Sequence, residues 1–352
     1  MFGNRELITA TRYRLAERRS NYDVTNTVDV SSAPAVRDSV LELFEDAYPH
    51  VSLDTIWMAF HDFDALFEGR LPEYKGCDTV YHDKQHSLDV TLATARLIAA
   101  HEKQCGTTDR IGEDRSIMTL IVALFHDAGY IRRTDEPQHL NGAEYTIWHV
   151  SRSAEFLRQY LPQLGLGDWA GVAARIVHFT GYEINLDDIE VSNSGDRLVG
   201  HFLGTADLIA QMADRCYLEK CRDRLYAEFV LAGIAVGKGP SDQPKVLYGS
   251  GIDLLRKTPD FFSRFARVRL DRNFNGAYRI INALYDGRNP YIAFIQQNFR
   301  YLRRLIRSES WLGLRRKPPC FTVLPNPQRS VNALVGRYLA RLNAPASALT
   351  IN

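Results

Sequence analysis

Residues 117–130 read IMTLIVALFHDAGY, a nearly continuous apolar run that ends in His126-Asp127. Apolar residues recur in it at helical spacing and leave no polar face, so the run predicts a helix buried in the protein core. Gly129 is placed to stop this helix. A histidine and an aspartate at the end of a buried helix need partners, because buried polar groups without them are costly. A metal ion would satisfy both side chains, since imidazole and carboxylate are common ligands; hydrogen bonds to the backbone are the alternative.

A second motif lies upstream, in residues 80–101, which read VYHDKQHSLDVTLATARLIAAH. Leucine and alanine recur there at helical spacing. His82 and His86 are four residues apart, so a helix places them on one face, roughly 6 Å apart along its axis, and Asp89 follows on the same face. A histidine pair alone is weak evidence for a ligand site. Because the HD helix follows directly, we expect these side chains to form one polar cluster with His126 and Asp127.

Three further polar residues, His149, His178 and Asp207, each lie within a separate later helical pattern. Asp207 has apolar neighbours in the run GTADLIAQ and is expected to face inward, which is costly for a carboxylate unless it is paired or ligating. Arg132 and Arg133 lie in a charged loop after the HD helix. They could reach a phosphate, although solvated loop arginines are the simpler interpretation.

The rest of the sequence contains further helical patterns and almost no strand signal, which predicts an all-α protein built as a multi-helix bundle. We distinguish a polar N-terminal extension over residues 1–36, a main helical domain over 37–310 and a C-terminal part over 311–352. This last part begins with the Pro-rich connector WLGLRRKPPCFTVLPNPQ and continues as an amphipathic helix, which leaves a homo-oligomer open.

Composition does not point to a nucleic acid or a membrane as partner. The chain has 352 residues and a formal net charge of +1, so no basic surface for a polyanion is indicated. No apolar run reaches transmembrane length, and the N-terminal residues lack the apolar segment of a signal peptide. The five cysteines are odd in number and include no CxxC pair, which favours reduced thiols in a cytoplasmic protein.

The order of the motifs, with two histidines, then HD, then a later aspartate, resembles the HD-domain metal-dependent phosphohydrolases. Residues 81–90, YHDKQHSLDV, are close to the YHNxxHxxDV motif of the class I cyclic nucleotide phosphodiesterases, and ALFHD at 123–127 is similar to their second motif. TADL at 205–208 and RLYAEF at 224–229 resemble their last metal-binding helix and its continuation. The resemblance covers residues 75–235 and implies an HD-domain, phosphodiesterase-like bundle with a metal site in its helical core.

This resemblance also implies a role for each matching residue. Four residues would ligate a first divalent metal ion: His86, His126, Asp127 and Asp207. Asp127 would bridge to a second ion, and the ions would activate a hydroxide that hydrolyses a phosphodiester bond of a cyclic nucleotide. His82 would donate the proton to the leaving oxygen, while Tyr81 and Asp89 would orient the metal ligands without contacting the metal themselves. Zinc, iron, manganese and magnesium all remain open as the metal.

The resemblance also bears on the roles of His149 and His178 and on the identity of the substrate. The spacing of His149 and His178 is similar to that of the extra histidines in the HD-GYP branch, which cleaves cyclic dinucleotides. Each is therefore a candidate for the second metal, and a core histidine bonded to the backbone is the alternative. The C-terminal glutamine-and-phenylalanine purine clamp has no clear counterpart, with Gln296, Gln297 and Phe299 as the only candidates.

The chain departs from the phosphodiesterase motifs at two further positions. Asp83 stands where the first motif has asparagine, and Tyr130 stands where HDxxH has its second histidine. Two other functions therefore stay open: a nucleotide phosphatase or alarmone hydrolase, and a catalytically silent nucleotide-binding regulatory module. The presence of His82 together with all four first-metal positions favours an enzyme.

Overall fold

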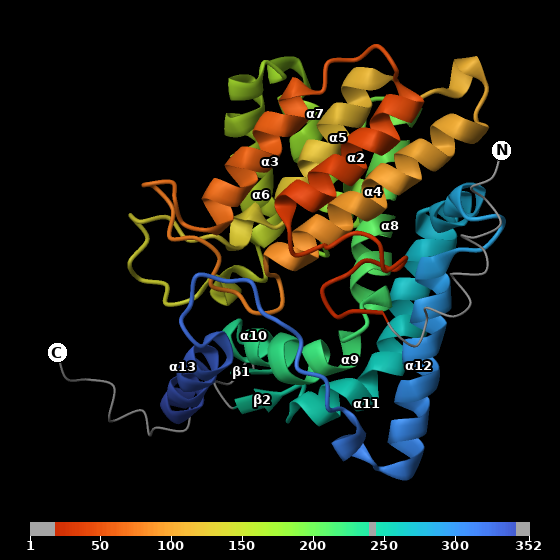
Figure 1. The fold of residues 1–352 in the computed structure, drawn as a ribbon. Helices are drawn as coiled ribbons and strands as arrows, with labels where there is room; N and C mark the ends of the chain where they lie inside the picture. The colour runs from red at the N-terminus through yellow and green to blue at the C-terminus, as the bar shows by residue number, and fades with distance from the viewer. Residues whose placement is uncertain (1–17, 239–243, 343–352) are drawn as a thin grey trace.

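The computed structural model describes residues 18–238 and 244–342, and over this part the chain is mostly helical, which confirms the all-α prediction. The helices are α2 (Ala33–Ala47), α3 (Asp54–Phe67), α4 (Lys84–Gln104), α5 (Glu113–Phe125), α6 (His149–Tyr160), α7 (Ala170–Ile176), α8 (Ser194–Ala213), α9 (Tyr217–Lys220), α10 (Tyr226–Leu231), α11 (Gly251–Phe261), α12 (Pro290–Ser308) and α13 (Pro327–Leu342). Helices α2 to α8 form the upper bundle in Figure 1, with α9 to α11 and α13 below it and α12 along one side.

Helix α4 is the central element of the bundle and packs against α2, α5 and α8. Every residue from Gln85 to Ala100 is buried, so this helix has no solvent face. Fully burying one of its leucines contributes roughly 1.5–3 kcal/mol, and Leu88, Leu92 and Leu97 are all fully buried. A helix enclosed in this way holds the side chains of its first turn in fixed positions.

Helix α4 begins at Lys84, four residues later than the pattern of residues 80–101 suggests. Asp83 is the reason, since its backbone is extended and its Oδ1 accepts hydrogen bonds from the backbone N–H groups of Gln85 and His86 at 3.1 and 3.3 Å. His82 therefore precedes the helix. The prediction that His82 and His86 share one helical face was wrong.

Helix α5 confirms the buried helix predicted from the apolar run, because every residue from Ser116 to Phe125 is buried. Its end differs from the prediction. Regular α-helix stops at Phe125, before the His-Asp pair, and Gly129 lies in a following 3-10 turn, Ala128–Tyr130. Gly129 is thus not the residue that ends the helix.

Two local features differ from a continuous helical bundle. After α9 comes a π-helical turn, Cys221–Leu225, which is followed by the short α10. Beyond it lies a small antiparallel hairpin of β1 (Val236–Lys238) and β2 (Pro244–Val246), with Val236 opposite Val246. Strands of three residues are too short to give a period-two pattern in the sequence.

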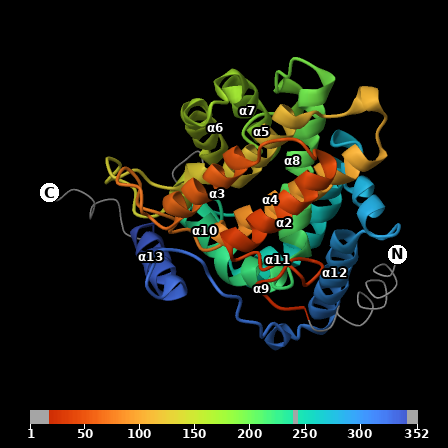
Figure 2. The ribbon, with the colours of Figure 1, turned by 45° about the horizontal axis from the view of Figure 1, so that its top comes forward.

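The C-terminal part packs directly on the main helical domain. We name residues 314–324 the strap; they are non-helical and cross α9 and α10 before α13 begins, as both ribbon views show (Figures 1 and 2). Val331 of α13 is fully buried in a small apolar cluster with Val80, Ala227 and Leu231. This cluster joins the strap region, α10 and the residues just before α4.

The N-terminal segment is attached to α4 by a buried ion pair. Asp23 accepts a hydrogen bond from Arg96 at 2.6 Å and others from the backbone N–H groups of Thr25, Thr27 and Val28. Burial alone would raise the pKa of Asp23, but the guanidinium and these hydrogen bonds outweigh it and lower the pKa to about 2 from 3.8.

This lowered pKa predicts a pH-dependent contribution to stability. A carboxylate whose pKa falls on folding stabilises the native state above its unfolded pKa, and the contribution is lost as pH drops from near 4 through 2. The gain from Asp23 is about 2 kcal/mol at neutral pH. We expect the difference in unfolding free energy between wild type and Asp23→Asn to be largest above pH 5 and to shrink below pH 4 in urea titrations. Asp38→Asn, an exposed control, should show almost no difference at any pH; a gap for Asp23→Asn that is independent of pH would contradict the assignment.

Within the described residues, none of the helices combines the length and the apolar character needed to cross a membrane.

Candidate metal centre

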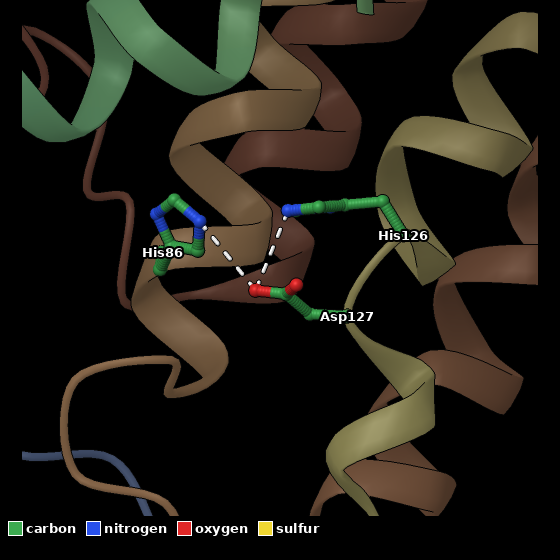
Figure 3. Close-up of side chains that lie close together, drawn as sticks. All are labelled: His86, His126 and Asp127. Carbon is green, nitrogen blue, oxygen red and sulfur yellow. Dashed lines mark ion pairs between the residues drawn. The ribbon is translucent and has the colours of Figure 1, made fainter. Parts of the chain in front are cut away.

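Three of the predicted ligands, His86, His126 and Asp127, meet at one buried point between α4 and α5, and Asp207 of α8 contacts His86. His86 lies in the first turn of α4, His126 and Asp127 follow the last turn of α5, and Asp207 lies in α8. Nε2 of His86 is 3.2 Å from Asp207 Oδ1 and 3.5 Å from Asp127 Oδ2, and Nε2 of His126 is 3.4 Å from the same Asp127 oxygen. Figure 3 shows the two imidazoles directed at the Asp127 carboxylate.

The hydrogen bonds at this point leave two ligand atoms without a partner. Nδ1 of His126 lies 2.7 Å from the carbonyl oxygen of Ala123, so in the neutral ring it donates there and Nε2 is an acceptor. Nε2 of His126 and Oδ2 of Asp127 are both buried, and neither has a hydrogen-bond partner among the residues that the structure describes. Two acceptors that face one another in a buried site require a proton or a cation between them.

A divalent cation fits this arrangement. Ligand atoms of His86, His126 and Asp127 all lie within 4.8 Å of one another, and the donor set of imidazole nitrogen and carboxylate oxygen suits zinc, iron or manganese. Burial raises the pKa of Asp127, but the surrounding imidazoles, led by His126, outweigh it and hold that pKa well below its usual range. The carboxylate is thus ionised and available as a ligand at neutral pH.

His149 extends the cluster on the other side of Asp127. Its Nε2 lies 3.7 Å from Oδ1 of Asp127, whereas His86 and His126 face Oδ2. Nδ1 of His149 lies 2.8 Å from the carbonyl oxygen of Thr146, which fixes the ring. Asp127 therefore presents Oδ2 to His86 and His126 and Oδ1 to His149.

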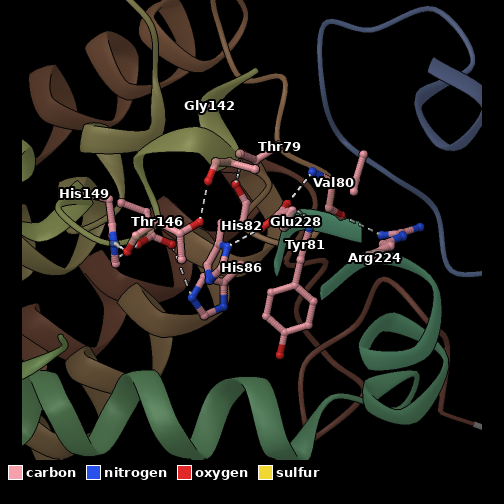
Figure 4. Close-up of polar contacts among 12 residues, drawn as sticks. Thr79, Val80, Tyr81, His82, His86, Gly142, Thr146, His149, Arg224 and Glu228 are labelled. Carbon is pink, nitrogen blue, oxygen red and sulfur yellow. Dashed lines mark hydrogen bonds and ion pairs between the residues drawn. The ribbon is translucent and has the colours of Figure 1, made fainter. Parts of the chain in front are cut away.

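His82 is held beside the cluster by a residue that the motif reading did not single out. Nδ1 of His82 lies 2.6 Å from Oε2 of Glu228, and Oε1 of Glu228 accepts from the backbone N–H groups of Val80 and Tyr81 at 2.7 and 2.6 Å (Figure 4). Glu228 is completely buried in α10. Burial lowers the pKa of His82, but the charge and hydrogen bond of Glu228 outweigh it and raise the pKa to about 9. A glutamate in the apolar run YAEFVL is the signal that could have identified it.

No family model, curated protein or solved structure matches this chain. The chemistry of the site therefore has to be argued from its own residues.

Tyr130 is a second residue whose position the motifs did not indicate. Its ring stacks against both His82 and His149, with centroid distances of 4.5 and 4.3 Å and interplanar angles of 15° and 22°, and the centroids of the two imidazoles lie 6.2 Å from each other. Tyr130 is buried and follows the HD pair by three residues, where the phosphodiesterase motif has histidine. The stack fixes both imidazole planes relative to each other.

Gly129 lets the HD turn approach α6 closely. A Cβ atom on Gly129 would lie 1.9 Å from the carbonyl oxygen of His149, and the Gly129 N–H donates to Ser153 Oγ at 2.9 Å. The requirement for glycine here comes from this backbone contact between two segments that both carry cluster residues.

Gly129→Ala is therefore expected to destabilise the fold and displace His149. The clash is with backbone atoms, which cannot rotate away, so we expect a loss of roughly 1–3 kcal/mol or more in unfolding free energy. Thermal or urea unfolding measures it. Gly171→Ala is the matched control, because the nearest atom to its Cβ is the tip of Arg175 at 3.6 Å. Equal stability of the two variants would rule out the close contact.

The predicted supporting residues divide into two groups. Tyr81 reaches the cluster indirectly, since its hydroxyl donates to Gln211 Oε1 at 3.1 Å and Gln211 Nε2 donates to Asp207 Oδ1 at 3.3 Å. Asp89 lines a small cavity beside His86 and Gln211, its Oδ1 is buried without a partner, and burial raises its pKa to about 7. His178 is half-buried in a 3-10 turn, and burial lowers its pKa. No ion pair of the described residues links Asp89 or His178 to the cluster.

Both candidate phosphate-binding arginines are paired elsewhere. Arg132 donates to Asp78 Oδ2 at 2.8 and 2.6 Å and to the carbonyl oxygen of His139. Arg133 donates to Asp135 at 3.1 Å on the surface. Among the candidates for a purine clamp, Phe299 is not available to a substrate. It is buried against Phe262, with ring centroids 4.3 Å apart.

Proposed function

We propose that this protein is a metal-dependent phosphohydrolase of HD-domain type, and that its substrate is the phosphodiester bond of a cyclic nucleotide. The observation that carries the proposal is the convergence of His86, His126 and Asp127 on one buried point, with Asp207 beside His86. Among the described residues, His126 Nε2 and Asp127 Oδ2 have no partner there. A purely structural cluster would satisfy those atoms. A cluster that takes a cation leaves them free.

Two divalent ions have distinct sets of ligands available in this proposal. His86, His126, Asp127 and Asp207 would hold one, and Asp127 with His149 would contribute to the other, because the two Asp127 oxygens face different histidines. Such ions, when bound, supply positive charge that lowers the pKa of a water molecule and neutralises phosphate oxygens.

His82 is the proton donor in this proposal. Glu228 accepts the Nδ1–H bond and raises the pKa of His82, which favours the imidazolium form with a proton on both ring nitrogens. This leaves Nε2–H to donate to the oxygen of the leaving group, which needs a proton as the ester bond breaks. The stack with Tyr130 restricts the ring to one plane, so the donor is oriented before the substrate arrives.

Hydrolysis of a substrate panel by the purified, manganese-supplemented protein tests the proposal. The panel holds 3′,5′-cyclic mononucleotides, cyclic dinucleotides, nucleoside monophosphates and guanosine polyphosphates, and His126→Ala is the blank. Turnover of a cyclic substrate to a monoester, absent in the blank, would support the diesterase. Release of free phosphate from monoesters alone would move the protein to the phosphatase alternative. No turnover with metal bound would favour the regulatory binding module.

A further inference from the structure

The strap contacts the short loop that carries His82. The N–H of Val323 donates to the carbonyl oxygen of Cys77 at 2.8 Å, and the N–H of Phe321 donates to Oδ2 of Asp83 at 3.0 Å. Residues 77 and 83 are the two ends of this loop, so the strap holds it at both ends. The Phe321–Asp83 contact joins residues 238 positions apart in the chain.

Arg224 connects the strap to the same loop from the other side. The buried guanidinium donates to the carbonyl oxygens of Pro318 and Pro319 in the strap and to that of Val80 in the loop at 3.4 Å. One helical turn later, Glu228 accepts from the Val80 N–H. Arg224 and Glu228 therefore hold the peptide units on both sides of Val80. The strap passes beside Arg224 (Figure 4).

Asp83 is the residue where these contacts meet. It is completely buried, its Oδ1 accepts the two N–H groups that begin α4, and its Oδ2 accepts from Phe321 and lies 3.8 Å from Arg224. Both oxygens therefore act as acceptors. Asparagine has one acceptor oxygen, and its NH₂ group would meet the Phe321 N–H donor to donor. This explains why the chain has aspartate where the resembling motif has asparagine.

We propose that the strap is a positioning element of the active site, and that it sets the place of His82 through the Asp83 carboxylate. The proposal rests on the proposed function for its catalytic consequence and on the contacts above for its structural one. Asp83 and Phe321 are positioning residues in this scheme, since they act through the loop and not on the substrate.

Asp83→Asn is the decisive variant, because asparagine caps a helix as well as aspartate does and removes only the second acceptor. We expect amide hydrogen exchange at Phe321 and Val323 to accelerate at least tenfold. We also expect kcat to fall at least tenfold, with KM and metal content unchanged. The imidazole N–H proton signal of His82, hydrogen-bonded to Glu228, should shift or broaden. Asp54→Asn, an exposed aspartate at the start of α3, is the matched control.

Arg224→Lys gives a second test that leaves Asp83 in place. Arg224 reaches the strap carbonyls through Nη2 and Val80 through Nη1, whereas the three donors of lysine share one nitrogen. The lysine should therefore lose part of this set, and the strap should again exchange faster. Unchanged exchange at Phe321 and Val323 in Asp83→Asn would overturn the proposal, as would a released strap that leaves both kcat and the His82 signal unaltered. If wild type hydrolyses nothing in the panel, the proposed function fails, while the exchange and imidazole measurements still decide the role of the strap.

Discussion

If the proposed function holds, His126→Ala is expected to lose divalent metal and to abolish turnover. The substitution deletes Nε2, which has no partner among the described residues, and leaves Asp127 and His86 as an incomplete set of ligands. Loss of an outer partner typically costs 10–100-fold in metal affinity, so the loss of a ligand should cost more than about 100-fold. Metal content after dialysis, measured by elemental analysis, checks this directly.

The chain contains a matched control for that experiment. His61 precedes Asp62 in a second HD pair, but it is largely exposed and bonds only its neighbour at 3.2 Å. His61→Ala should keep the metal, the turnover and the unfolding midpoint of the wild type. Retention of metal by His126→Ala, or equal loss from both variants, would mean that the metal centre is misassigned.

His82→Ala should show the opposite combination of full metal content and low activity. In the proposed function, His82 lies outside the first set of ligands and would carry the proton for the leaving oxygen, so its removal should reduce kcat by roughly 10²–10⁴-fold. Single-turnover rates with elemental analysis on the same sample separate the two effects. An unchanged rate would exclude the proton-donor role.

Glu228→Gln refines this test, because it preserves shape and removes charge. Without the carboxylate, burial lowers the pKa of His82, so less of the imidazole is protonated at neutral pH. We expect the alkaline limb of the kcat profile to move to lower pH and the rate at pH 7 to fall by roughly tenfold to a hundredfold, less than for His82→Ala. A profile that keeps its alkaline limb would show that Glu228 does not set this ionisation.

The sequence predicts the parts of this molecule that are encoded locally. The buried helix before His126 follows from the apolar run, and the inward position of Asp207 follows from its apolar neighbours, as its burial in α8 confirms. The start of α4 could also have been found, because aspartate is a strong N-cap. An N-cap at Asp83 places His82 outside the helix.

Other features depend on contacts between distant segments and leave little trace in a single sequence. Glu228 meets His82 across 146 positions, and its one local signal is a charge within an apolar helix. Tyr130 contacts both His82 and His149 only when α6 has packed on the HD turn. The glycine requirement at Gly129 likewise comes from α6 and not from helix termination.

The long-range contact between Asp83 and Phe321 has a consequence for the protein during its synthesis. A nascent chain that has emerged from the ribosome as far as residue 200 contains His86 and Asp127 but lacks Asp207, Glu228 and the strap. Glu228 can meet His82 only after residue 228 has been made, and the Asp83–Phe321 contact forms only after residue 321. The loop that carries His82 can thus take its described position only late in translation, well after His86, His126 and Asp127 have been made.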